Sequence, residues 1–301
     1  MEQAEERSND SLAMRLQELE KENAMLKRIL DQHGISYSVS VESSTIEQPT
    51  HIVTDHTIRL SLQEKVAIFQ NLFKGRDDVF AKRWYSPSSQ KAGYQPVCER
   101  EWNREYCDKR KYKCADCPNR QFAHLSYNDF FNHLAGKDQF GRDVIGLYPI
   151  CQDNTCYFLC TDFDDKNCEH GYKNDVLAFV NVCNSWNVPC YIERSRSGNG
   201  AHVWIFFNKP ITALKARKLG NAILNREARL SFKSYDRFFP NQDSLPEGGL
   251  GNLVALPLQG MARRKGNSVF VDNKFNAYED QWTFLSQIHK FSETELDLLL
   301  R

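Results

Sequence analysis

The sequence has no excess of charge of either sign, no long apolar run and no hydrophobic leader. Its 39 basic and 39 acidic residues give a formal net charge of zero. This removes the simplest argument for nucleic-acid binding, which is a strongly basic chain. No apolar stretch approaches the roughly eighteen residues that cross a membrane, and the first residues are acidic and polar, unlike a secretory signal. We therefore expect no membrane association and, at most, a local nucleic-acid surface.

Local clusters of basic side chains are the candidates for such a surface. A solvated face explains each cluster as well, because runs of charge are most often simply exposed. The clusters are Lys109, Arg110, Lys111 and Lys113; Lys215, Arg217 and Lys218; and Arg263, Arg264 and Lys265. None of them decides the function by itself.

Ten cysteines without a secretory leader indicate a reducing compartment, so we expect a cytoplasmic protein whose thiols bind metal or fill the core. Four of them lie in polar surroundings and end in a Cys-x-x-Cys, a spacing that lets four thiolates form a closed tetrahedral Zn²⁺ site with a structural role. These four are Cys98, Cys107, Cys114 and Cys117. His133 is a substitute ligand. A redox pair is the alternative, but the βαβ context that usually accompanies one is missing.

The N-terminal region predicts a coiled-coil helix over residues 1–32, followed by a flexible linker over residues 33–58. Leucines and one asparagine alternate at spacings of four and three, the a/d seam of a heptad, and a buried Asn favours a parallel homodimer. The seam consists of Leu12, Leu16, Leu19, Asn23, Leu26 and Leu30. A lone amphipathic helix that packs on its own domain is the alternative to a dimer through residues 12–30.

The remaining chain predicts a mixed α/β (α+β) fold with an antiparallel-rich sheet, because strands and helices alternate with short connections. Residues 59–143 form an N-terminal unit with the zinc-binding insertion, and residues 144–301 form the core. Ser61 and Glu64 predict a capping box at a helix start. We expect strands at 144–151 and 156–162, paired as a hairpin, and at 189–193, 202–207, 252–258 and 268–272. Helices are expected at 174–186, 213–226 and, closing the chain, 281–289.

Asp162 and Asp164 lie two residues apart on a predicted strand, so their side chains share one face. Neighbouring carboxylates repel one another unless a cation lies between them, and Mg²⁺ or Mn²⁺ with oxygen ligands meets that need. Asp236 is the best candidate for a third carboxylate, with Asp243 as its rival. Three carboxylates can hold two ions roughly 4 Å apart and catalyse phosphoryl transfer.

A glycine-containing turn follows the next predicted strand. Gly198 and Gly200 permit a tight turn and a close approach of backbone amides to phosphate oxygens. His202 begins the following strand and can donate a hydrogen bond to a phosphate, while Arg194 and Arg196 supply charge. A Gly-x-Gly turn alone is most often structural, but these basic neighbours favour phosphate binding.

Together these elements resemble the archaeo-eukaryotic primase superfamily, whose pattern is an Asp-x-Asp/Glu strand, a small-residue turn ending in His, and a further Asp. The resemblance is closest to the primase module of TOTE conflict systems and to CRISPR-associated primase-polymerases, and it covers about residues 60 to 290. It is carried by Lys74–Val79, Gly93–Cys98, Glu193–Phe207, Tyr235–Asp243, Gly251–Gln259 and Gly266–Asp272.

The resemblance implies an RRM-like catalytic sheet joined to an N-terminal α/β unit, nucleoside triphosphates as substrates and a single-stranded or primed template. Asp162, Asp164 and Asp236 would be the catalytic metal ligands, and His202 would contact the nucleotide phosphates. Ser197 and Asn199 would line the triphosphate, although related polymerases often carry a Lys near Asn199. Some members continue into a helicase, so the sequence is either a stand-alone form or the front of a longer protein, with a helicase partner in cis or in trans.

Three hypotheses follow for the function. A DNA primase-polymerase explains the carboxylates and the turn together. A metal-dependent nuclease would use the same carboxylates but has no need of a triphosphate pocket. A non-catalytic, zinc-containing nucleic-acid-binding module has no use for clustered carboxylates, which repel phosphate. The sequence favours the primase-polymerase.

Overall fold

The computed structural model describes residues 60–165, 171–226 and 233–301, and a few single positions between 21 and 32. The chain divides into two units, residues 1–57 and 58–301, and both sheets belong to the second. The predicted zipper of residues 12–30 and the linker of residues 33–58 fall almost wholly outside the described residues. Within the described part, no helix has the length and apolar character needed to span a membrane.

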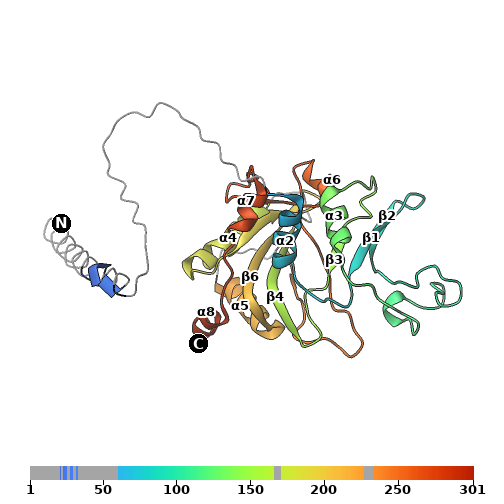
Figure 1. Cartoon of the computed structure of the whole chain (residues 1–301), viewed down its shortest axis with the longest axis horizontal. Coiled ribbons are helices and arrows are strands. Elements are labelled where there is room, and N and C mark those ends of the chain that lie inside the picture. The colour runs from blue at the N-terminus through green and yellow to red at the C-terminus, as the bar shows by residue number, and fades with distance from the viewer. Residues whose placement is uncertain are drawn as a thin grey trace. The chain divides into compact units, whose positions relative to one another are not determined.

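Two antiparallel sheets organise the second unit (Figure 1). The four-stranded sheet has the order β2-β1-β3-β8, with β1 Ala81–Ser86, β2 Lys91–Pro96, β3 Ile145–Leu147 and β8 Val254–Ala255. The five-stranded sheet has the order β7-β4-β6-β5-β9, with β4 Thr155–Asp164, β5 Tyr191–Arg194, β6 Gly200–Thr212, β7 Tyr235–Phe239 and β9 Val269–Val271. The mixed α/β fold with antiparallel sheets is confirmed.

The helices cover the sheets and close the unit. Their bounds are α2 Leu62–Leu72, α3 Tyr127–Ala135, α4 Tyr172–Ser185, α5 Ala213–Arg226, α6 Gly260–Arg263, α7 Gln281–Ser286 and α8 Glu293–Leu299, with a 3₁₀ turn at Cys114–Asp116. The helix predicted at 213–226 has the predicted bounds. The capping box at Ser61 is also confirmed: its hydroxyl accepts from Glu64 N, and Glu64 accepts from Ser61 N.

Opposite faces of the five-stranded sheet have different roles because strand residues alternate between them. On one face Phe163 of β4 packs against Phe179 of α4, with 5.9 Å between ring centroids. On the other face Trp204 of β6 stacks on Phe206 and meets Phe73, the residue that ends α2. The even-numbered residues of β4 therefore lie on the face away from α4.

Two expectations for the strands and helices are wrong. The segments at 144–151 and 156–162 do not form a hairpin: β3 pairs with β1 and β8, whereas β4 pairs with β6 and β7. All three residues of β3 are buried, so this strand needs cover on both faces and joins the other sheet. The segment at 281–289 does not close the chain either, because α8 follows it with its own capping box at Ser292.

Candidate active site

Asp162 and Asp164 end strand β4 and project from the face away from α4. The third carboxylate comes from β7, whose pairing with β4 shifts register between Asp162 and Phe163. A shift of this kind inserts an extra residue and re-aims side chains. Here the inserted residue is Asp236, and one oxygen from each of the three aspartates lies within 4.8 Å of the others.

The three carboxylates form a site that fits a divalent cation. Burial raises the pKa of Asp162 to about 6, and the charges of Asp164 and Asp236 add to that rise against the opposing effect of His202. Such mutual repulsion is relieved by a cation with oxygen ligands. Arg237 also donates from Nε to Asp236 Oδ2 at 2.6 Å. Asp243, the rival third carboxylate, instead pairs with Arg217 and lies outside the cluster.

His202 lies directly opposite Asp162 in the β4–β6 ladder, with Nε2 3.4 Å from Asp162 Oδ1. Its Nδ1 is 2.9 Å from Oε2 of Glu193, and the indole of Trp204 donates to the same oxygen at 2.9 Å. Burial alone favours the neutral imidazole, but Glu193 and the aspartates outweigh it and raise the pKa of His202 to about 9. The ring is therefore fixed with Nε2 toward the three aspartates.

The glycine turn, residues 195–200, joins β5 to β6 at the same end of the sheet. Gly200 lies opposite Asp164, and an added β-carbon there would be 2.4 Å from the carbonyl oxygen of Phe163. Gly198 has a φ of +83°, which L side chains rarely adopt. Ser197 and Asn199 are exposed, and the Ser197 hydroxyl accepts from Asn199 N. Glycine at position 200 therefore lets the turn lie close to Asp164, and glycine at position 198 permits the positive φ and the contact with Asn267.

The two arginines of this region have different environments. Arg194 donates from its two terminal nitrogens to the carbonyls of Gly266 and Phe275, at 2.6 and 2.5 Å. Because these bonds hold the guanidinium against the backbone, they argue against the phosphate role predicted for Arg194. Arg196 lies on the turn itself and is exposed. The charge that the turn offers to a ligand therefore comes from Arg196.

Comparison with known proteins agrees with this geometry. The profile of the TOTE conflict system, Archaeo-Eukaryotic Primase domain, matches residues 64–299, which is more than half of the chain. The chain belongs to this primase family. No curated protein matches it significantly. Membership supports a primase-like nucleotidyltransferase function that uses divalent metal, nucleoside triphosphates and nucleic acid.

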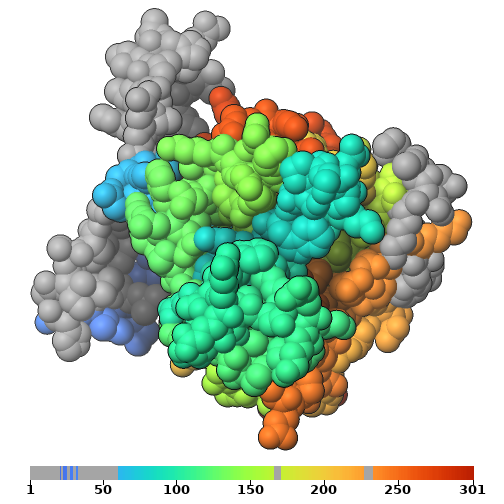
Figure 2. Space-filling model, turned by 90° about the vertical axis from the view of Figure 1, so that its right-hand side faces the viewer, coloured from blue at the N-terminus to red at the C-terminus, as the bar shows by residue number. Residues whose placement is uncertain are grey.

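The cysteine module of this primase domain lies at the front of Figure 2, in the teal and green part of the surface. Cys98, Cys107, Cys114 and Cys117 all line one small cavity, and all four are free thiols. Burial raises the pKa of Cys114, and the neighbouring Cys107 and Cys98 add to the rise. Among the described residues, only the three aspartates bring three ligand atoms within 4.8 Å of one another, so the four thiols share a cavity without forming so tight a group.

His133, considered as a substitute zinc ligand, lies elsewhere. It is fully buried in α3, its Nε2 donates to the carbonyl of Pro257 at 2.8 Å, and its Nδ1 accepts from Ile145 N at 3.1 Å. Both ring nitrogens are therefore satisfied by the backbone. His133 is a core residue of the primase domain and has no nitrogen left for a metal.

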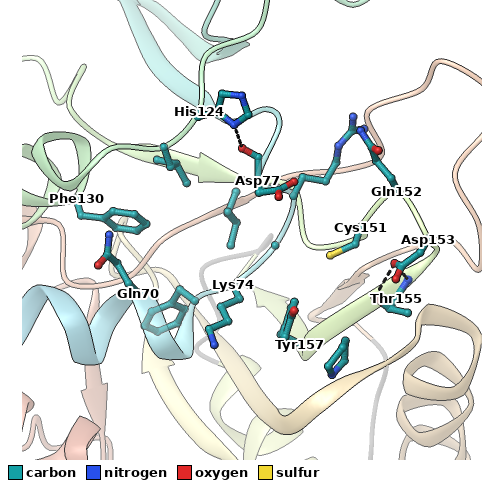
Figure 3. A pocket seen from close by; sticks show the side chains of 16 residues that line it. Gln70, Lys74, Asp77, His124, Phe130, Cys151, Gln152, Asp153, Thr155 and Tyr157 are labelled. Atoms are coloured by element: carbon teal, nitrogen blue, oxygen red, sulfur yellow. Dashed lines mark hydrogen bonds between the residues drawn. The ribbon is translucent and has the colours of Figure 1, made fainter.

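A cavity of about 640 Å³ (Figure 3) is lined by the first residues of β4, whereas the aspartates lie at the other end of that strand. The cavity is lined by segment 74–77, one of those that carry the resemblance, and by Thr155 and Tyr157 of β4. Arg76 forms a bidentate pair with Asp78 at 2.7 and 2.5 Å and also donates to a backbone carbonyl. Arg76 is thus paired within the protein, which indicates a structural role for this residue.

Each of the three basic clusters has a residue that is paired within the fold, and in the first cluster Lys109 pairs with Glu101. Lys215 pairs with Glu293 and Asp297 of α8, and Arg264 donates to backbone carbonyls after α3. These contacts favour the ordinary explanation of those clusters over a nucleic-acid surface.

Glu193 and Arg237 are the site residues that sequence reasoning missed. Glu193 is 1% exposed, an unusual burial for a carboxylate, and it lies opposite His202 in the β5–β6 ladder. An acidic residue inside the apolar strand before the turn is a signal that could have found it. Arg237 has no such signal, because its position depends on the β7 register shift.

Proposed function

We propose that this primase domain is a template-dependent nucleotidyltransferase that joins nucleoside triphosphates to a primer or to a first nucleotide. The observation that carries the proposal is the set of Asp162, Asp164 and Asp236 facing His202 beside the glycine turn. Carboxylates for a cation and donors for phosphate at one end of one sheet are what nucleotidyl transfer requires.

The protein's own groups would act by position and charge. Asp162, Asp164 and Asp236 would hold the metal site, and His202 would donate to a phosphate oxygen from a ring fixed by Glu193. The turn, through its backbone and Ser197 to Gly200, would bind the triphosphate. Bound Mg²⁺ or Mn²⁺ would supply Lewis acidity to the attacking hydroxyl and to the leaving pyrophosphate.

A metal-dependent nuclease remains the second candidate because it would use the same three carboxylates. The glycine turn and the pair of Glu193 with His202 favour the polymerase, since hydrolysis of a strand needs no triphosphate site. A non-catalytic binding module explains neither feature.

The deciding experiment is incorporation of labelled nucleotides on a single-stranded template, with and without a primer, in Mg²⁺ or Mn²⁺. We expect metal-dependent products that disappear in the double variant Asp162→Ala, Asp164→Ala while its circular dichroism stays that of the wild type. Asp153→Asn, at the other end of β4, is the matched control and should retain synthesis. Strand degradation in place of extension would support the nuclease instead.

We also propose that Cys98, Cys107, Cys114 and Cys117 bind one structural Zn²⁺. The donor set and the shared cavity support this, because four thiolates match closed zinc sites. Chelation, or Cys114→Ser with Cys117→Ser, should lower the unfolding temperature, since binding energy of a structural ion is folding energy. Elemental analysis that finds no stoichiometric zinc in the purified protein would contradict the assignment.

Three further proposals concern the surroundings of the domain: a cytoplasmic location, a helicase partner in cis or in trans, and a homodimer through residues 12–30. The dimer has the simplest test. Deletion of residues 1–32 should halve the mass measured by light scattering, and an unchanged mass would exclude the zipper.

A further inference from the structure

An arginine and a tyrosine form a cross-strand pair at the edge of the four-stranded sheet, and among the described residues the arginine has no carboxylate counterion. Arg83 of β1 lies directly opposite Tyr94 of β2. The Arg83 guanidinium donates to the carbonyl of Phe140, and it forms no ion pair with any described residue. The Tyr94 hydroxyl is enclosed, yet within the described part of the chain it has no hydrogen-bond partner of normal geometry. This pair offers donors that the fold does not use.

The glycine turn is held near this pair through α6, which lies beside α3 (Figure 1). Arg264, at the end of α6, donates to the carbonyl of Gly136 at 2.6 Å. Gly136 lies in the loop that leads to Phe140, whose carbonyl accepts from Arg83. Three residues after Arg264, Asn267 fills the space beside Gly198, where an added β-carbon would be 2.8 Å from its Oδ1. The short segment from α6 to Asn267 thus ties the loop after α3 to the turn that carries Arg196.

Arg83, Tyr94 and Arg196 also act on one another electrostatically. Burial lowers the pKa of Arg83, and the like charge of Arg196 lowers it further. Burial raises the pKa of Tyr94, while Arg196, whose side chain approaches the hydroxyl, and Arg83 oppose that rise. Asp138 also acts on Arg83, but Nε and Nη2 of Arg142 already hold its carboxylate at 2.9 and 2.7 Å. Both guanidinium groups therefore act on Tyr94, and among the described residues neither forms an ion pair with a carboxylate.

This arrangement suits an anion with several oxygens. Like charges in one place repel unless an opposite charge lies between them, and the planar guanidinium fork matches the oxygens of a phosphate. We propose that Arg83, Arg196 and the Tyr94 hydroxyl bind a phosphate group beside the glycine turn. The N-terminal unit would thereby complete a site that the turn alone leaves open.

The inference rests on the proposed function, because the phosphate would come from one of that reaction's two substrates. One source is the triphosphate of a nucleotide, and the other is the backbone of the template or primer strand. Both present the same oxygens, so two binding probes distinguish them.

The test measures binding of deoxyadenosine triphosphate by calorimetry and of a labelled oligothymidylate by fluorescence anisotropy, both with Mg²⁺ and the full chain. Arg83→Gln should weaken one of the two about tenfold, the scale of a lost charge-assisted hydrogen bond. Arg226→Gln is the matched control, because that arginine is exposed at the end of α5, and it should weaken neither. If the strand is the source, the salt slope should also become shallower by about 0.7 per lost contact.

Two further variants keep the test decisive if Arg83→Gln fails to fold. Arg196→Gln changes an exposed turn residue and should weaken the same probe as Arg83→Gln. Tyr94→Phe removes only the hydroxyl and should weaken that probe a few-fold with an unchanged unfolding temperature. Unaltered binding of both probes in the folded variants would overturn the site. A wild-type protein that binds but never synthesises would refute the proposed function alone, and one that synthesises while the variants bind normally would refute the site alone.

Discussion

Two histidines in different regions of the domain, one fully buried and one with 12% of its side chain exposed, have opposite electrostatic surroundings. His133 of α3 meets only backbone groups, the amide of Ile145 and the carbonyl of Pro257, and the ring of Phe69 lies 5.9 Å away between centroids. Burial lowers the pKa of His133 to about 4. A ring whose partners are one neutral donor and one neutral acceptor is satisfied only in its neutral form.

His202 is also largely enclosed, yet its partners are the carboxylates of Glu193 and Asp162. Burial works against its charge, but these carboxylates raise the pKa of His202 to about 9. The difference teaches that burial alone does not separate a core histidine from a site histidine. The charge of the partners does, because only carboxylates stabilise an imidazolium away from water.

The largest difference between the two histidines is expected when the imidazole ring of each is removed by substitution with alanine. His202→Ala should lower nucleotide incorporation about 10²- to 10³-fold, the scale for removal of one donor to a developing charge. His133→Ala should lower the free energy of unfolding and leave the rate per folded molecule unchanged. Steady-state incorporation, corrected for the folded fraction by circular dichroism, measures both. A rate loss in His133→Ala as large as that in His202→Ala would break the distinction.

A smaller effect is expected from neutralising the partner of His202. Glu193→Gln keeps the size of the side chain and removes its charge, so activity should fall about 10- to 100-fold, as for outer partners of site histidines. In the metal-free protein the pKa of His202, followed by NMR of its ring protons, should fall from about 9. Trp204→Phe, which removes the other donor to Glu193 but no charge, is the control and should leave that pKa close to the wild-type value. An unchanged pKa in Glu193→Gln would show that Glu193 does not control the charge of the ring.

Much of this arrangement could be predicted from local sequence, because its causes are local. The two-residue alternation of Asp162 and Asp164 puts both on one face of any strand, and the capping signal at Ser61 acts within one helical turn. The helix over residues 213–226 has the predicted bounds. The roles of the site residues themselves stay predictions, since geometry shows which groups meet and not what they catalyse.

The parts that could not be predicted depend on register between distant segments. Nothing near Asp236 indicates that its strand slips by one residue against β4. Arg194 donates to backbone carbonyls at positions 266 and 275, more than seventy residues away along the chain. The neighbouring sequence therefore does not indicate that Arg194 is held by the backbone while Arg196 is exposed. The hairpin at 144–162 failed for a similar reason, because β3 joins strands that are not its neighbours along the chain.

The smallest effect concerns stability alone and appears only in acid. The unfolded chain protonates His133 near pH 6.5, whereas the folded protein resists protonation until about pH 4. Below pH 6.5 the unfolded state therefore binds more protons, and stability falls as the pH falls. Between pH 7 and pH 5 this histidine should cost about 2 kcal/mol of unfolding free energy.

Urea unfolding of the wild type and of His133→Gln at both pH values isolates this contribution, because carboxylates shared by the two proteins cancel in the difference. Glutamine keeps an amide donor and an acceptor but has no proton to gain in this range. His133→Gln should therefore be the less stable protein at pH 7 and should lose less stability between pH 7 and pH 5. Equal pH dependence in the two proteins would mean that His133 takes up a proton as readily in the folded protein as in the unfolded chain. The contrast between the neutral His133 and the charged His202 would then be wrong.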